Sequence, residues 1–203
     1  MSPRRSAAQA RNTRAAIVAR AMAVASVEGL EGLTIGRLAD DLGLSKSGLL
    51  GHFGSKQGLQ LAVVEAAAEV FRREVVAPAS GNAPGLPRLR AQCEAWISYL
   101  ERAAFPGGCL LTAAAVEFDD RDGPVREAVL AQQDAWLAEL RSQGERAARS
   151  GDLPAGADPE QLAFDLLGVM LALNQRLRLH RDPEAPRRAR RAVDRLLGAR
   201  EPA

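Results

Sequence analysis

Lys46 and Lys56 are the only lysines of this 203-residue chain, and small polar residues surround the first of them. Ser45, Ser47 and Gly48 are short enough to let a large partner approach the start of a helix closely. Backbone N–H groups and the helix dipole at such a start favour phosphate, and nearby cations add to the attraction. The segment therefore predicts phosphate-binding chemistry.

The cysteines and histidines are too sparse to predict a metal or disulfide site. Cys93 and Cys109 lack CxxC spacing, and His52 and His180 lie far apart without nearby ligand partners. We therefore expect no metal and no other cofactor. A thiol at a helix start can be reactive, so a thiol sensor or helical enzyme centred on Cys109 stays open as an alternative to a buried, inert cysteine.

A small acidic group, Glu117, Asp119 and Asp120, precedes Arg121 and a predicted turn. Such a group could hold a divalent cation, but charge runs are usually solvated, so we interpret it as an exposed helix end. The sequence has no nucleophile elbow, no phosphate-binding glycine loop and no dinucleotide fingerprint. We expect a protein that is not an enzyme.

The composition indicates a globular, all-α protein. Hydrophobic residues make up 47% of the chain and charged residues 26%, with a formal net charge of +2. No apolar stretch approaches the roughly 18 residues of a membrane span, and the start lacks an apolar secretory segment, so we expect a cytoplasmic location. Strand-like alternation is rare, whereas helical periodicity predicts about nine helices, over residues 8–28, 34–42, 45–51, 55–77, 86–105, 109–118, 124–149, 158–180 and 186–198.

Residues 34–53 have the pattern of a helix-turn-helix. Gly43 supplies the turn and Leu44 fills its corner, while Thr34 and Ser45 are predicted N-caps. A second helix held in this way can enter the major groove of DNA. The same unit also occurs as a mere packing corner. The first helix is predicted to bury Ile35, Leu38, Ala39 and Leu42.

Cations outnumber anions in the first 58 residues. The anions there are Glu28, Glu31, Asp40 and Asp41. An excess of positive charge beside a helix-turn-helix favours phosphate partners. The cations are Arg4, Arg5, Arg11, Arg14, Arg20, Arg37, Lys46 and Lys56.

The segment from Thr34 to Leu59 resembles the DNA-binding signature of the TetR family of transcriptional regulators. The likeness depends on Ala39, the Gly43-Leu44-Ser45 turn and the run His52-Phe53-Gly54-Ser55-Lys56-Gln57-Gly58-Leu59. It covers about residues 11–65. The resemblance implies a DNA-binding domain over 1–58 and an effector-binding and dimerisation domain over 59–203, joined through a helix of about 55–77.

By position, the resemblance also implies contacts to double-stranded operator DNA. Lys56 would bind a phosphate, and Thr34 would cap its helix and touch the DNA backbone. Leu50 stands where the family commonly has tyrosine, so one phosphate-binding hydroxyl is missing, and a ligand-binding module without specific DNA recognition stays open as an alternative. With Gly48, the residues expected on or beside the groove-facing surface are Ser45, Lys46, Ser47, Leu49 and His52.

The rest of the chain resembles the family's regulatory domain, which implies a small-molecule effector. Large apolar side chains from several helices can enclose such a ligand, with Asn174 as a polar anchor, although an ordinary filled core is the simpler interpretation of each. The pocket candidates are Trp96, Phe105, Cys109, Phe118, Trp136, Met170 and Asn174.

The resemblance further implies a homodimer formed through the last two long helices. Two recognition helices would then meet successive major grooves about 34 to 36 Å apart on a palindromic operator. The interface candidates are Leu162, Leu166, Val169, Met170, Leu173, Leu177, Val193 and Leu196.

Overall fold

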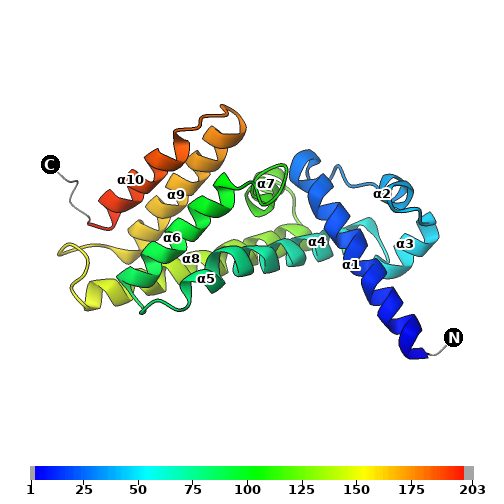
Figure 1. Cartoon of the computed structure of the whole chain (residues 1–203), viewed down its shortest axis with the longest axis horizontal. Coiled ribbons are helices and arrows are strands. Elements are labelled where there is room, and N and C mark those ends of the chain that lie inside the picture. Colours follow the sequence, from blue (N-terminus) through cyan, green and yellow to red (C-terminus); the bar gives the residue numbers. More distant parts are fainter. Residues whose placement is uncertain (1–2, 199–203) are drawn as a thin grey trace. The chain divides into compact units, whose positions relative to one another are not determined.

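The computed structural model describes the backbone of residues 3–198 and the side chains of residues 7–198. All regular secondary structure in that range is helical, which confirms the predicted fold class (Figure 1). The helices are α1 (Pro3–Glu28), α2 (Ile35–Leu42), α3 (Lys46–Phe53), α4 (Lys56–Phe71), η1 (Arg72–Val76), α5 (Ala77–Ala79), α6 (Leu86–Glu101), α7 (Leu110–Glu117), α8 (Pro124–Arg149), α9 (Pro159–Arg178) and α10 (Ala185–Leu196). Within the described range, α4, η1 and α5 follow one another without a break, so nine separate rods result.

The predicted helix of 55–77 continues a little further than its sequence suggests. Pro78 lies inside the short α5, where a proline would ordinarily disturb a helix. The five residues before α5 form the π-helical turn η1, and the N–H of Ala77 donates to the carbonyl of Arg72. The chain therefore leaves the helix only after Ala79.

The described helices form two compact units. The first consists of Met1–Ala68 and Phe105–Leu130, and the second of Glu69–Ala104 and Ala131–Ala203. The first unit thus contains α1 to α3, most of α4, α7 and the start of α8. The division of the chain after residue 58 stays a prediction. Among the described residues, no helix combines the length and the hydropathy needed to cross a bilayer.

The core of the first unit is built from apolar positions at helical spacing. On α1, Ile17, Ala21 and Val24 are buried on one face. Leu38 from α2 and Leu49 from α3 are fully buried in the same unit. Burying a leucine side chain contributes about 1.5 to 3 kcal/mol, so these residues hold α2 and α3 in a fixed arrangement.

The core of the second unit includes a cluster of aromatic rings. Phe71 meets Trp96 at 5.7 Å, Tyr99 at 5.8 Å and Trp136 at 5.1 Å between ring centroids, each in an edge-to-face arrangement. Trp96 and Trp136 pack in the same way at 5.2 Å. Such pairs add about 0.5 to 1.5 kcal/mol beyond their buried area.

Ion pairs connect α10 to α6 in the second unit. Arg190 donates to Glu94 at 2.8 Å and to Glu101 at 3.0 Å, and Arg90 pairs with Asp194 at 3.0 Å. The two helices and α9 lie side by side (Figure 1). The helices α9 and α10 therefore pack against α6 and against each other.

Candidate nucleic-acid interface

The turn between α2 and α3 is fixed by local hydrogen bonds. Gly43 adopts the left-handed conformation, with φ of 63° and ψ of 33°, and its N–H caps the end of α2. Thr34 accepts a hydrogen bond from the N–H of Arg37 at 3.3 Å, and Ser45 accepts one from the N–H of Gly48 at 3.0 Å. Both predicted N-caps are confirmed. Their hydroxyls satisfy amides that a helix start leaves unpaired, so each cap stabilises its helix.

The N-terminal half of α3 is exposed. Ser45, Lys46, Ser47 and Gly48 all face solvent, and Gly51 continues that exposed surface by one turn. None of these residues is large enough to hide the helix backbone except Lys46. The helix therefore presents a low surface that a DNA groove can approach closely.

Leu49 corrects the predicted set of groove-facing residues. Its side chain is fully buried, so it belongs to the core and not to the surface. At about 100° per residue, Leu49 points away from Ser47 and Gly51, which are exposed. Leu50 and His52 flank the exposed face and are half-buried.

The ammonium group of Lys46 has no ion-pair partner among the described side chains. Its aliphatic chain lies over α2, where a Cβ on Gly36 would come within 3.3 Å of the Lys46 Cε atom. Gly36 therefore leaves room for this side chain. Lys46 is an exposed cation at the start of α3 whose charge is available to a partner.

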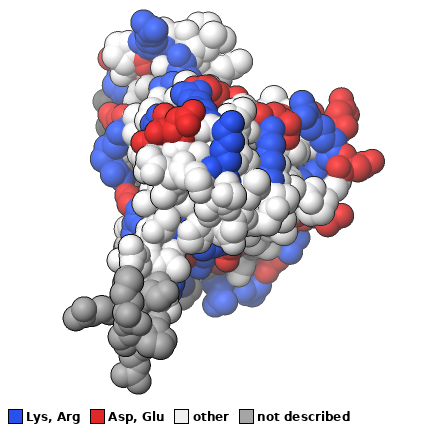
Figure 2. Space-filling model, turned by 90° about the vertical axis from the view of Figure 1, so that its right-hand side faces the viewer, with Lys and Arg blue, Asp and Glu red and all other residues white. Residues whose placement is uncertain are grey.

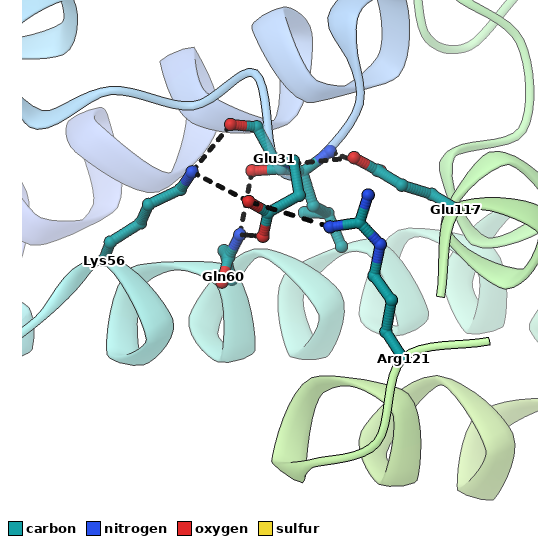
Figure 3. A network of polar contacts seen from close by, with 6 residues as sticks. Glu31, Lys56, Gln60, Glu117 and Arg121 are labelled. Atoms are coloured by element: carbon teal, nitrogen blue, oxygen red, sulfur yellow. Dashed lines mark hydrogen bonds and ion pairs between the residues drawn. The ribbon is translucent and has the colours of Figure 1, made fainter. Parts of the chain in front are cut away.

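Lys56, in contrast, is already engaged. Its Nζ donates to the main-chain carbonyl of Glu31 at 2.7 Å and to the Glu31 carboxylate at 3.2 Å (Figure 3). Gln60 donates to the same carboxylate at 2.8 Å and to the carbonyl of Leu30 at 3.0 Å. The Gln60 hydrogen bond, followed by that of Lys56, holds the pKa of Glu31 below its usual value despite partial burial. An ammonium has three donors, so Lys56 keeps one for a further acceptor.

Glu117 is a member of this network that sequence reasoning missed. Its carboxylate accepts the N–H of Leu30 at 2.7 Å and the N–H of Glu31 at 2.8 Å (Figure 3). The interpretation of Glu117 as a solvated helix end is therefore wrong, since it binds the turn between α1 and α2. Gly29 is the feature of the sequence that could have predicted this contact. After a helix that ends in a left-handed glycine, the backbone N–H groups that follow can bind an anion.

Internal ion pairs offset much of the predicted positive charge. Arg20 pairs with Asp41 at 2.7 Å, and Arg37 pairs with Glu28. The side chains of Arg4 and Arg5 lie outside the described residues. Figure 2, seen from the side on which α2 and α3 lie, shows Lys and Arg side chains together with Asp and Glu side chains around an uncharged area. Fewer cations of the first 58 residues are therefore free to attract phosphate than their number in the sequence suggests.

A second anchoring contact fixes α1 against α3. The guanidinium of Arg14 lies over the ring of Phe53, 5.0 Å from its centroid. Such a cation–π contact contributes about 0.5 to 1 kcal/mol at an exposed site. Arg14 therefore helps to orient the end of α3, next to the exposed face that begins at Ser45.

The predicted pocket residues fall into both units. Trp96, Trp136, Met170 and Asn174 belong to the second unit, where the two indoles pack together. The indole N–H groups of Trp96 and Trp136 are buried without a hydrogen-bond partner among the described residues, as is the side-chain carbonyl of Gln92. The first unit contains the remaining three candidates, Phe105, Cys109 and Phe118.

Both thiols are buried. Cys109 is the N-cap of α7 and Cys93 lies inside α6. Burial raises the pKa of Cys93 to about 12, so this thiol stays protonated at neutral pH. Because the thiolate is the reactive form, this favours a structural role for Cys93. Cys109 is buried as well, which keeps it away from reagents in solvent.

The predicted dimer interface requires a correction. Leu162, Leu166, Met170, Leu173 and Val193 are buried within the single chain, so they cannot form its surface. Val169, Leu177 and Leu196 are half-buried. The exposed apolar side chains of this region are instead Phe164, Leu171 and Leu179.

Comparison with known proteins gives a consistent result for both halves of the chain. Residues 85–193 match the family described as Tetracyclin repressor-like, C-terminal domain, and residues 17–63 match the family described as Bacterial regulatory proteins, tetR family. No curated protein matches the sequence significantly.

Solved structures share the fold over almost the whole chain. A TetR transcriptional regulator from Chloroflexus aurantiacus is 28% identical, with a TM-score of 0.84 over 91% of this chain and 93% of that one. A TetR-family regulator from Streptomyces coelicolor is 26% identical, with a TM-score of 0.76 over 94% and 95%. AibR, which is 22% identical, has a TM-score of 0.75 over 91% and 97%. Since the helix-turn-helix segment and the larger C-terminal segment both match, this chain belongs to the TetR family of transcriptional regulators.

Proposed function

We propose that this regulator is a repressor that binds a palindromic operator as a homodimer and leaves it when a small molecule binds. The observation that carries the proposal is the start of α3, where capped, exposed small residues surround the unpaired ammonium of Lys46. A helix start of this kind can approach phosphates and base edges in a major groove. The protein would act in the cytoplasm as a regulator and not as an enzyme.

The proposed DNA contacts are Thr34, Ser45, Lys46, Ser47, Gly48 and Lys56, with His52 at the edge. The solved AibR structure contains isovaleryl coenzyme A and operator DNA, which supports both kinds of ligand for a protein of this fold. Because Leu50 has no hydroxyl, one contact to a DNA phosphate would be missing, which would make the free energy of DNA binding less favourable by on the order of 1 kcal/mol. Binding would be weakened by that loss and not abolished.

The experiment that tests this proposal compares Lys46→Ala with the wild type on a duplex that the wild type selects from a random pool. We expect about fivefold weaker binding and a salt dependence reduced by about one phosphate contact. Arg146→Ala is the matched control, since Arg146 is an exposed cation on α8 within the second unit. Equal losses in both variants would mean that only net charge matters, and the contact assigned to Lys46 would be rejected.

The effector site is proposed around Trp96 and Trp136 in the second unit. A buried donor without a partner costs about 1 to 3 kcal/mol, so a ligand that supplies an acceptor would gain that energy. The orphaned indole N–H groups therefore favour an apolar molecule that presents an oxygen acceptor. A ligand that binds one arrangement of the dimer better than the other would shift the population away from the operator.

The dimer is proposed to form through the exposed face of α9. Phe164 is 69% exposed, and Leu171 lies two helical turns further along the same helix. Exposed apolar side chains that repeat at helical spacing favour burial against a second subunit. This face replaces the inward-facing leucines that the sequence suggested.

A further inference from the structure

In the turn between α1 and α2 of the first unit, the backbone N–H and carbonyl groups of Leu30 and Glu31 all form hydrogen bonds with side chains. Its N–H groups, at Leu30 and Glu31, donate to the Glu117 carboxylate. Its carbonyls accept from Gln60 and Lys56. A single turn thus connects the end of α7 with the start of α4, although Leu30 and Glu117 lie 87 positions apart in sequence (Figure 3).

The backbone conformation of the turn is shaped to receive a carboxylate. Gly29 has a φ of +80°, which turns the N–H groups that follow it toward one side. A Cβ at Gly29 would lie 2.6 Å from one Glu117 carboxylate oxygen and 2.8 Å from the other. Hydrogen bonds from backbone N–H groups to a carboxylate are about twice as strong as those between neutral groups. The turn and Glu117 therefore fix each other.

A second contact holds the loop before α7 against the last turn of α1. The N–H of Gly107 donates to the Ser26 hydroxyl at 3.1 Å, and Ser26 is buried. A Cβ on Gly107 would come within 1.5 Å of the Ser26 carbonyl oxygen, so only glycine fits. Contacts on both sides of α7 thus hold the end of α1, and Glu117 has little freedom to leave the turn.

We infer that Glu117 is a positioning residue for DNA binding, which acts through Glu31 on Lys56. By fixing the main chain of Glu31, the Glu117 carboxylate sets the position of the two Glu31 oxygens that hold the Lys56 ammonium. This inference rests on the proposed contact between Lys56 and a DNA phosphate. It assigns to α7, far from the helix-turn-helix in sequence, an indirect part in that contact, through Glu31.

The physical reason is the flexibility of lysine. Ordering a free lysine side chain costs rotamer entropy. Because two Glu31 oxygens already hold the Lys56 ammonium, this entropy is lost before DNA binds. The third donor of the ammonium stays available for a phosphate. Without Glu117 the turn loosens, Lys56 regains its freedom, and a phosphate must order it again.

The experiment is a double-mutant cycle of Glu117→Gln and Lys56→Ala, with affinity measured on the duplex selected by the wild type. Glutamine keeps the size of the side chain, but its amide nitrogen would face a backbone N–H, so one hydrogen bond is lost. The matched control is Glu127→Gln, since Glu127 is exposed in the same unit and has no ion pair among the described residues. Glu117→Asp, which keeps the charge and shortens the reach, serves as a second variant if Glu117→Gln does not fold.

We expect Glu117→Gln to weaken DNA binding about fivefold in the wild-type background and to have almost no effect when Lys56 is already alanine. The amides of Leu30 and Glu31 should exchange with solvent about tenfold faster in Glu117→Gln. Glu127→Gln should change neither quantity.

Two outcomes separate the inference from the proposed contact. Losses that add in the double variant would show that Glu117 acts independently of Lys56, and the inference would be overturned although Lys56 binds DNA. Full affinity in Lys56→Ala would remove the phosphate contact itself and the inference with it. Unchanged amide exchange in Glu117→Gln would also overturn the positioning role.

Discussion

At the scale of single residues, the two lysines of this chain have different surroundings and should contribute differently to DNA binding. Lys46 is exposed without an ion-pair partner among the described side chains, whereas Lys56 shares its charge with Glu31. A phosphate at Lys56 therefore meets a cation that is pre-positioned but partly neutralised. A phosphate at Lys46 meets a full charge on a side chain that must still be ordered.

Glu31 gives the first unit a pH-dependent contribution to stability. Hydrogen bonds from Gln60 and Lys56 lower the pKa of Glu31, so the folded state prefers the ionised carboxylate. This stabilisation is complete above the usual glutamate pKa of 4.5 and is lost as the pH falls through the lower pKa of the folded state. Because the side chain is 43% exposed, we expect it to stay below about 1 kcal/mol.

Urea denaturation of the wild type and of Glu31→Gln at a series of pH values checks this prediction. The wild type should be the more stable protein at pH 7, and the difference should shrink below about pH 4.5. A difference that grows on acidification would contradict the assigned sign.

At the scale of elements, the sequence was informative wherever the interaction is local. The N-caps Thr34 and Ser45 and the left-handed Gly43 act on groups within a few residues of themselves, so the helix-turn-helix could be predicted from spacing alone. Leu49 was misplaced because its assignment followed the family resemblance position by position, and α3 is too short for its period to show that this side chain faces the core. The role of Glu117 could not be predicted, because its partners in the α1–α2 turn are brought to it only by the tertiary fold.

The buried side of α9 could not be predicted from the sequence either. Leucines recur on both sides of this helix, so its period alone does not show which side faces the core. The structure places Leu166 inside and Phe164 outside. Phe164→Glu should therefore weaken self-association at least about tenfold, because a carboxylate would have to be buried between subunits.

Sedimentation velocity across a range of concentrations measures this effect. The matched control is Val116→Glu, since Val116 is an equally exposed apolar residue, at 70%, but lies on α7 in the first unit. A dimer that persists in Phe164→Glu and is lost in Val116→Glu would place the interface elsewhere.

At the scale of the whole molecule, the proposed operator binding requires two copies of one DNA-binding unit to act together. The family assignment and the all-helical fold establish what kind of regulator this is. A two-fold dimer presents two identical α3 helices, and an operator that fits both must repeat its sequence in inverted order. Neither half alone would supply the affinity of the pair.

Selection of duplexes from a random pool by the purified wild type tests this claim most directly. We predict enrichment of an inverted repeat whose half-sites lie about one helical turn, or a multiple of it, apart, bound by two subunits or a multiple of two. Enrichment of a single unrepeated site bound by one subunit, or no enrichment at low salt, would rule out operator binding by a two-fold dimer.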